Sequence, residues 1–195
     1  MVSAGSQEVI EAMKASLSKG ENPMLMVVDM QQGIVGDVSV FKEQIREQAT
    51  VIKFATSFEP PIPVIDMKMG RSSSVHSEIY SAIRDSLLFD AEKLYCDAFS
   101  NVSAISSGKV FLDDDIIPIG DFIREKGVGA LFLVGCVDTV CVRSTAEGAL
   151  RQKENLNVYV DRSINIPPPK AGDTSWKDIE GNERLHFITS PSCPE

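Results

Sequence analysis

One cysteine of this 195-residue chain has a setting typical of a nucleophile. Cys141 follows an apolar run at 130–134 that is typical of a buried strand, and it lies at the start of a helical pattern at 140–153. A thiol near a helix N-terminus meets the positive end of the helix dipole and unpaired N–H groups, and both favour the thiolate. The same N–H groups can stabilise the oxyanion that forms when a thiolate attacks a carbonyl. The segment therefore predicts nucleophilic chemistry at Cys141.

The proton acceptor for such a thiol must come from elsewhere in the chain. Only two histidines are present, His76 and His186, and neither lies near Cys141 in the sequence. Asp29 ends an apolar run at 24–28, and a carboxylate at a strand tip can act as a general base. A lysine beside this pair would lower the pKa of the thiol and orient the carboxylate. The sequence thus favours chemistry by a carboxylate, an amine and a thiol.

Short apolar runs that alternate with helical patterns must position these groups. The predicted helices are 7–18, 40–57, 76–88, 116–126 and 140–153, and the predicted strands are 24–28, 64–65, 130–134, 157–160 and 185–189. Apolar runs without alternation suit parallel strands buried on both faces, and strands that alternate with helices are typical of βαβ units. We therefore expect an α/β fold with a mainly parallel sheet, in which ligands bind at the carboxyl ends of the strands. Lys93 lies between predicted helices, near the end of another short segment.

The segment 100–120 has the weakest pattern. We interpret it as a loop with a short strand at 110–112, followed by the helix at 116–126. The acidic triplet Asp113–Asp115 is interpreted as a solvated helix N-terminus, where negative charge suits the helix dipole. A metal site is the alternative interpretation of the triplet.

Length and composition limit the classes of protein. The length predicts one domain, 1–195, with a core at about 24–165 and a loop-rich tail at 166–195. The formal net charge of -9 disfavours nucleic acid as a partner. The chain has no secretory leader pattern and no apolar run of membrane-spanning length, and the cysteines form no Cys-x-x-Cys pair. We therefore expect a reduced, cytoplasmic protein that does not bind a membrane.

Motifs of three common enzyme classes are missing. The sequence contains no G-x-G-x-x-G, no G-x-x-x-x-G-K-[ST] and no G-x-S-x-G. A dinucleotide enzyme, a P-loop nucleotidase and a serine α/β-hydrolase are therefore disfavoured.

Three blocks of the sequence resemble motifs of the isochorismatase-like cysteine hydrolases. Val27-Val28-Asp29-Met30-Gln31 is similar to the first-strand motif of that family, and Lys93 through Phe99 is similar to its lysine segment. Gly135 through Ala146 resembles the family's Cys block, Gly-x-x-Thr-x-x-Cys-Val-x-x-Thr-Ala. The blocks occur in the family's order, and each lies beside the expected element.

The resemblance implies a fold and a set of roles. It implies a three-layer αβα sandwich with a six-stranded, mainly parallel sheet. Asp29 would be the general base, Lys93 its partner and Cys141 the nucleophile. The peptide bond Cys136–Val137 would be cis, and the N–H groups of Val137 and Cys141 would form the oxyanion hole.

Other positions carry weaker implications or depart from the family pattern. Gln31, Phe99 and Asp138 are candidate substrate contacts, although Gln31 can equally position loop backbone. Asp138 stands where the Cys block usually has Thr, and its carboxylate would repel anionic substrates or bind an amide N–H. Lys93 and Cys141 lie 48 positions apart, which predicts an insertion around 101–115 that reshapes the rim of the pocket.

The chemistry that these residues favour is hydrolysis of a C–N amide bond, because isochorismatases proper cleave a vinyl ether without a cysteine. The family's metal-binding nicotinamidases carry Asp-x-His, whereas Asp66 is followed here by Met67 and Lys68, so we expect no metal and no other cofactor. The expected substrate is a small amide or ureide. Specificity would come from loops at 33–38, 68–75, 100–112 and 166–176.

Other functions stay open from the sequence. They are vinyl ether hydrolysis, a thiol redox reaction in which Cys136 resolves oxidised Cys141, and a catalytically inactive binding scaffold. Relatives are often dimers or tetramers, so we expect a homo-oligomer.

Overall fold

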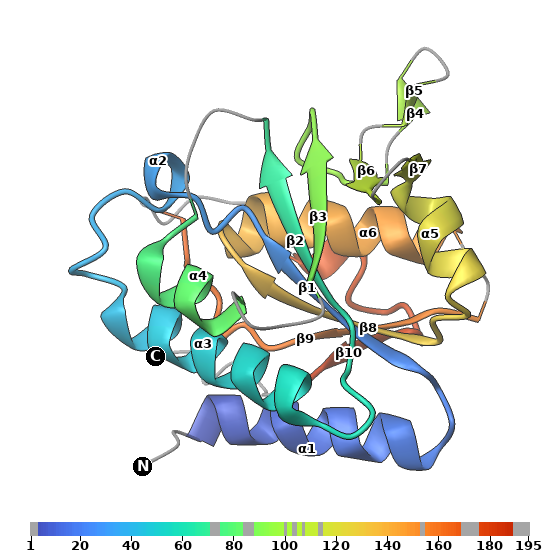
Figure 1. Ribbon diagram of the computed structural model, residues 1–195, viewed down its shortest axis with the longest axis horizontal. Coiled ribbons are helices and arrows are strands. Elements are labelled where there is room, and N and C mark those ends of the chain that lie inside the picture. The colour runs from blue at the N-terminus through green and yellow to red at the C-terminus, as the bar shows by residue number, and fades with distance from the viewer. Residues whose placement is uncertain are drawn as a thin grey trace.

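A single sheet runs through the molecule and helices cover both of its faces (Figure 1). The computed structural model describes residues 4–70, 75–83, 88–99, 101–102, 105–106, 108–112, 115–152, 155–168 and 176–188. The fold is α/β, as the alternation of apolar runs and helical patterns predicts.

The sheet has eight strands rather than the expected six. Their order is β10-β9-β8-β1-β2-β3-β6-β7. The six strands from β10 to β3 are mutually parallel, whereas β6 and β7 are antiparallel additions at one edge. The bounds are β1 Pro23–Val28, β2 Val64–Met69, β3 Leu88–Lys93, β6 Gly108–Phe111, β7 Ile116–Pro118, β8 Ala130–Gly135, β9 Asn157–Val160 and β10 Leu185–Phe187.

The two extra strands come from the segment whose pattern was weakest. Leu112 and Asp115 exchange backbone hydrogen bonds of 2.9 and 3.1 Å in a tight turn that pairs β7 with β6. The prediction of a helix at 116–126 was therefore wrong at its start, because 116–118 is a strand and helix α5 begins at Ile119. Asp115 precedes a strand instead of opening a helix, while Asp113 and Asp114 lie outside the described residues. A separate hairpin joins β4 (Asn101–Val102) to β5 (Ile105–Ser106).

The helices divide between the two faces of the sheet (Figure 1). Buried side chains of α1, α3 and α4 pack in one apolar cluster, and those of α5 and α6 pack in the other. The bounds are α1 Ala4–Ser18, α2 Gln32–Val35, α3 Lys42–Ser57, α4 Ser77–Ile83, α5 Ile119–Glu125 and α6 Arg143–Gln152, with a 3₁₀ turn η2 at Trp176–Asp178.

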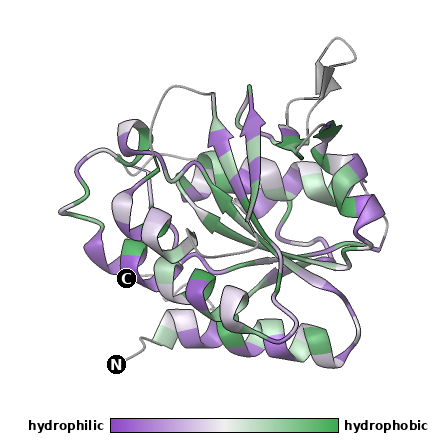
Figure 2. Cartoon of the chain, in the orientation of Figure 1, coloured by the Kyte–Doolittle hydropathy of each residue, from purple (hydrophilic) through white to green (hydrophobic). Residues whose placement is uncertain are grey.

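The central strands β1 and β8 are buried along their whole length, as their continuous apolar runs predict. Successive side chains of β1 alternate between the faces: Met24 and Met26 join the α5/α6 cluster, and Leu25 and Val27 join the α1/α3/α4 cluster. Figure 2 shows hydrophobic residues along the strands at the centre of the sheet.

One predicted element was assigned wrongly in a way that matters for the site. The helix predicted at 76–88 ends at Ile83, and Leu88 begins β3. Lys93 is the last residue of strand β3, so it lies near the end of a short segment between helices α4 and α5, as predicted. The register pairs Val28 with Met67 and Met69 with Lys93, so the carboxyl ends of β1, β2 and β3 meet at one edge of the sheet.

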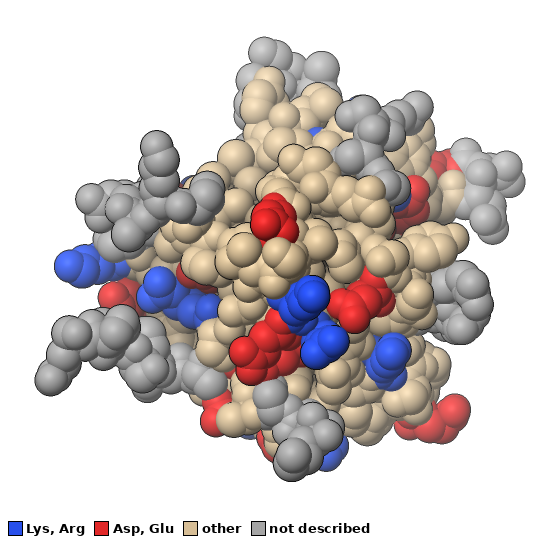
Figure 3. Space-filling view, turned by 90° about the vertical axis from the view of Figure 1, so that its left-hand side faces the viewer, with Lys and Arg blue, Asp and Glu red and all other residues tan. Residues whose placement is uncertain are grey.

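The surface carries charges of both signs. On the face shown in Figure 3, acidic and basic side chains of the described residues lie side by side instead of forming one broad basic patch. No helix within the described residues is both long enough and apolar enough to span a membrane.

Candidate active site

Asp29 lies at the carboxyl end of β1, where the backbone turns sharply. Its φ of 53° is in the left-handed region, which is uncommon for a residue other than glycine. The Asp29 N–H donates to the Met67 carbonyl at 2.8 Å and so ties the turn to β2. The side chain is fully buried. A strained and buried carboxylate at a strand end is typical of a functional group.

Lys93 reaches the same place from β3. Its side chain is fully buried, and Nζ lies 3.0 Å from Asp29 Oδ2. Nζ also donates to the Cys96 carbonyl at 2.8 Å, and Thr145 Oγ1 of α6 donates to that same carbonyl at 3.1 Å. The ammonium is thus held between a carboxylate and a carbonyl that is itself fixed to α6.

Cys141 completes the group from a single π-helical turn, Asp138–Val142, which joins β8 to α6. Cys141 is 5% exposed. The strand before the turn can approach β1 only because Gly135 has no side chain: with a φ of 147°, a Cβ there would lie 2.1 Å from the Val28 carbonyl oxygen. The close approach brings the turn beside Asp29.

The pKa of the Cys141 thiol is raised, contrary to the lowering that a helix N-terminus alone would cause. Burial raises the pKa of Cys141, and the Asp29 carboxylate raises it further, while the Lys93 ammonium opposes both effects. Burial also raises the pKa of Asp29, although Lys93 and the Cys141 thiol lower it. A neutral thiol therefore faces a carboxylate that is a stronger base than an exposed one.

Val137 and Cys141 carry the two N–H groups that the family resemblance assigns to an oxyanion hole. The Cys136–Val137 peptide bond is cis. Within the described residues, no hydrogen bond leads from the Val137 N–H or the Cys141 N–H to a group outside the Asp138–Val142 turn. Their role in binding an oxyanion stays a prediction.

Gln31 and Phe99 serve the architecture of the site. Gln31 Oε1 accepts from the Met69 N–H at 2.8 Å, and its Nε2 donates to the Met69 carbonyl at 3.3 Å, so the side chain joins the loop after β1 to the end of β2. Phe99 is buried in the cluster under α5 and α6. Neither placement assigns the side chain to a substrate.

Asp138 binds neighbouring protein groups. Its carboxylate is buried and accepts from Arg162 Nε at 3.1 Å, Asn165 Nδ2 at 3.2 Å and Trp176 Nε1 at 3.1 Å. Neither periodicity nor a motif in the sequence points to these three partners. The one clue was the departure of Asp138 itself from the Cys block.

The remaining candidates lie apart from this chemistry. Cys136 is buried, and burial raises its pKa to about 12, which makes it a poor resolving thiol. Lys68 Nζ lies 3.8 Å from Asp66 Oδ2 and also contacts Asp90. The ammonium would repel a cation at Asp66. Within the described residues, no group of three or more His, Cys, Asp or Glu could hold a metal.

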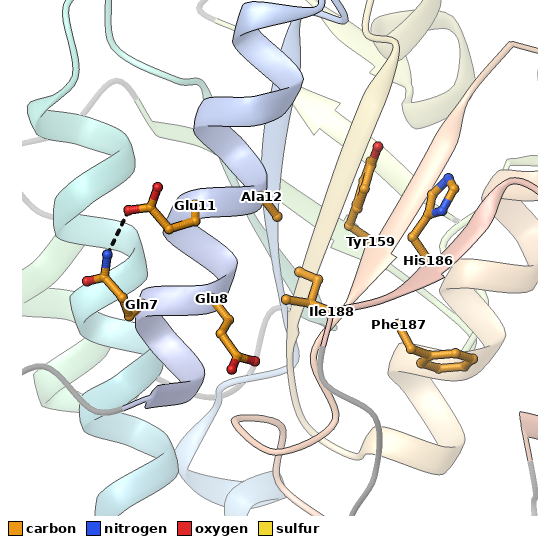
Figure 4. A pocket seen from close by; sticks show the side chains of 8 residues that line it. All are labelled: Gln7, Glu8, Glu11, Ala12, Tyr159, His186, Phe187 and Ile188. Atoms are coloured by element: carbon orange, nitrogen blue, oxygen red, sulfur yellow. Dashed lines mark hydrogen bonds between the residues drawn. The ribbon is translucent and has the colours of Figure 1, made fainter.

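A hollow of about 390 Å³ lies away from Asp29, between α1 and the strands β9 and β10, of which β10 is the edge strand. Figure 4 shows the rings of Tyr159 and His186 side by side across from Ala12, with Glu11 turned away toward Gln7. The two rings stack with centroids 4.7 Å apart. This hollow is open and holds no thiol.

Comparisons with known proteins identify the fold. No protein-family model matches the sequence, and no curated protein matches it. Among solved structures, an isochorismatase-like hydrolase from Alkaliphilus metalliredigens matches with a TM-score of 0.61 and 18% identity, over 86% of this chain and 92% of that one. N-carbamoylsarcosine amidase from Thermoplasma acidophilum matches with a TM-score of 0.59 and 18% identity, over 88% and 99% of the chains. The nicotinamidase of Staphylococcus aureus matches with a TM-score of 0.58 and 14% identity, over 84% and 96%.

Proposed function

We propose that this chain, which has the isochorismatase-like hydrolase fold, is a cysteine hydrolase that cleaves a C–N amide bond of a small molecule. The observation that carries the proposal is the buried ion pair of Asp29 and Lys93 beside the Cys141 turn. Desolvated charges are costly unless they are paired, so a chain that keeps them at the ligand-binding edge of its sheet uses them there.

Asp29 is the proposed general base. Asp29 Oδ2 is ion-paired with Lys93, and the Asp29 carboxylate also accepts from the Cys141 thiol, which lowers the pKa of Asp29. Asp29 takes the thiol proton as Cys141 Sγ forms a bond to the substrate carbonyl carbon. The carbonyl π electrons move to oxygen, and the N–H groups of Val137 and Cys141 bind that oxyanion.

The second half of the reaction reverses these transfers. When the oxyanion collapses, the C–N bond breaks, and the proton on Asp29 passes to the departing nitrogen. A thioester on Cys141 remains. Water then attacks the thioester carbonyl while Asp29 accepts its proton, and breakage of the C–S bond releases a carboxylic acid and restores the thiol.

Lys93 keeps the Asp29 carboxylate ionised and in place. Burial favours the neutral carboxylic acid, and the ammonium at 3.0 Å counters that effect. Without Lys93, the base would hold a proton in the resting state and could not accept one from the thiol.

Two comparisons support an amide as the substrate. The structural neighbours include an N-carbamoylsarcosine amidase and a nicotinamidase. A vinyl ether hydrolase needs no nucleophilic thiol, so that reaction would not account for the place of Cys141 beside Asp29. The metal of the nicotinamidase branch does not fit, because Lys68 places a positive charge near Asp66. A homo-oligomer and a cytoplasmic location stay predictions.

An ammonia-release screen of small amides and ureides tests the proposal. We expect at least one compound to be hydrolysed by the chain and to be left intact by Cys141→Ala. Cys136→Ala is the matched control, because it removes a buried thiol two residues from the turn and should keep most of the activity. Hydrolysis that persists in Cys141→Ala would exclude the thioester route.

A further inference from the structure

The carboxylate of Asp138 joins the Cys141 turn to two later segments of the chain. Arg162 and Asn165 reach it from the loop after β9, and Trp176 reaches it from η2. Asp138 and Trp176 are 4% and 2% exposed, so the indole N–H and the carboxylate meet away from water. A buried carboxylate with three donors is held in one orientation, because losing any donor would leave charge unsatisfied.

The loop after β9 also holds the backbone on both sides of the Cys136–Val137 peptide. Before it, the Gly135 N–H donates to Asn165 Oδ1 at 2.9 Å, and the Gly135 carbonyl accepts from the Ile166 N–H at 2.9 Å. After it, the Asp138 N–H donates to the Ile166 carbonyl at 2.8 Å. Asn165 thus uses its oxygen for Gly135 and its nitrogen for the Asp138 carboxylate. One side chain connects the two ends of the peptide.

We propose that Asp138 is a positioning residue that fixes the direction of the oxyanion-binding N–H groups. This inference rests on the proposed function, because it assigns the Val137 and Cys141 N–H groups to the developing oxyanion. Asp138 belongs to the same turn as Cys141 and directly follows Val137. Its three partners therefore fix the backbone atoms from which both donors project. Asp138 itself touches no reacting atom.

The substitution Asp138→Asn tests the role with little change in volume. The amide places an NH₂ where one carboxylate oxygen accepted, so it faces N–H donors instead of satisfying them. The two N–H donors lose their fixed direction, while the hydrogen bond from the Cys141 thiol to Asp29 keeps the thiol beside its base. The expected result is a weaker oxyanion site with an unchanged nucleophile.

Two probes separate these properties without any turnover. Labelled acetaldehyde forms a thiohemiacetal: the Cys141 Sγ–C bond forms, and the carbonyl oxygen gains the negative charge and then the thiol proton. Methyl methanethiosulfonate instead forms a mixed disulfide and releases methanesulfinate, and it has no carbonyl oxygen. We expect Asp138→Asn to weaken the thiohemiacetal about tenfold or more, and to keep the disulfide rate within about twofold.

Asp178→Asn is the matched control. Asp178 lies in the same 3₁₀ turn as Trp176, but its side chain is 75% exposed and pairs with Arg143 rather than with Asp138. It should change neither probe. Trp176→Phe, which keeps an aromatic ring and removes one donor, should weaken the thiohemiacetal less than Asp138→Asn and serves if that variant does not fold.

The positioning role would be overturned if Asp138→Asn and Trp176→Phe reduced the thiohemiacetal affinity and the disulfide rate equally. It would also be overturned if neither variant reduced the thiohemiacetal affinity. Failure of the ammonia-release screen is a separate result, because neither probe requires amide hydrolysis. A wild-type chain that forms no thiohemiacetal would overturn both proposals.

Discussion

Two lysine–carboxylate pairs show how location decides what a charge does in this molecule. The Lys14–Glu11 pair beside the α1 hollow has an N–O distance of 2.8 Å, and its side chains are 44% and 56% exposed. The Lys93–Asp29 pair in the candidate active site is longer, at 3.0 Å, but fully buried. Water screens the first pair, so the shorter distance has little effect on stability. In the second pair neither charge has solvent as a substitute partner.

Removal of each lysine gives the largest expected contrast. Lys93→Met should destabilise the fold by about 3–5 kcal/mol, because it leaves Asp29 buried without its counter-ion. Lys14→Met should cost no more than about 1 kcal/mol. Urea unfolding of the two variants measures both values. Equal losses would show that the Asp29–Lys93 pair is more hydrated than its burial indicates.

Asp29→Asn should separate thiol reactivity from catalysis. The Asp29 carboxylate raises the pKa of Cys141, so its neutralisation leaves Lys93 free to lower that pKa. Alkylation of Cys141 by iodoacetamide near neutral pH should therefore become faster, while amide hydrolysis falls by about 10²–10⁴-fold for want of a base. Slower alkylation together with full hydrolysis would contradict the role of Asp29.

Asp66 should make stability depend on pH. Burial raises its pKa in the folded chain from 3.8 to about 6, so the folded state binds a proton more tightly than the unfolded state between those values. Unfolding free energy should fall as the pH rises from about 4 to about 6, by at most about 3 kcal/mol from this group. Asp66→Asn should remove the part of that slope that comes from Asp66, while Asp29, whose pKa is also raised by burial, still contributes. The same change at the exposed Asp121 should keep the whole slope.

The smallest effect is expected in the α1 hollow. Tyr159→Phe removes a hydroxyl that donates to Glu21 at 3.3 Å but keeps the ring stacked between Phe132 and His186. The cost should be no more than about 1 kcal/mol, with no change in amide hydrolysis. A large loss of hydrolysis in Tyr159→Phe would mean that the hollow belongs to the catalytic apparatus.

The part of the fold that follows from local pattern could be predicted. The apolar runs of β1, β8 and β9 have one compatible interpretation, since each is short, continuous and bounded by turns or helices. The strands β3, β6 and β7 could not be predicted in this way. Leu88 and Phe89 form a strand only because β2 lies beside them, and β7 forms because it pairs with β6. Such pairing between distant segments is a tertiary effect and does not show in the local periodicity of the sequence.

The candidate site divides in the same manner. The places of Asp29 and Cys141 at strand ends could be predicted because each ends or follows a recognisable strand, whereas the role of Lys93 came only from the family resemblance. The pKa of Cys141 could not be predicted, because the helix-terminus argument omits burial. Asp138 stood out as a departure, but its partners Arg162, Asn165 and Trp176 lie 24 to 38 positions away and meet it only in the folded chain.

Trapping of the thioester tests the central claim most directly. An amide that releases ammonia in the screen is mixed with the chain, quenched in acid within the first turnover and examined by intact mass and peptide mapping. The account predicts an acyl group on Cys141 in the wild type and none in Cys141→Ala. Hydrolysis with an acyl group on another residue, or full hydrolysis in Cys141→Ala, would contradict it.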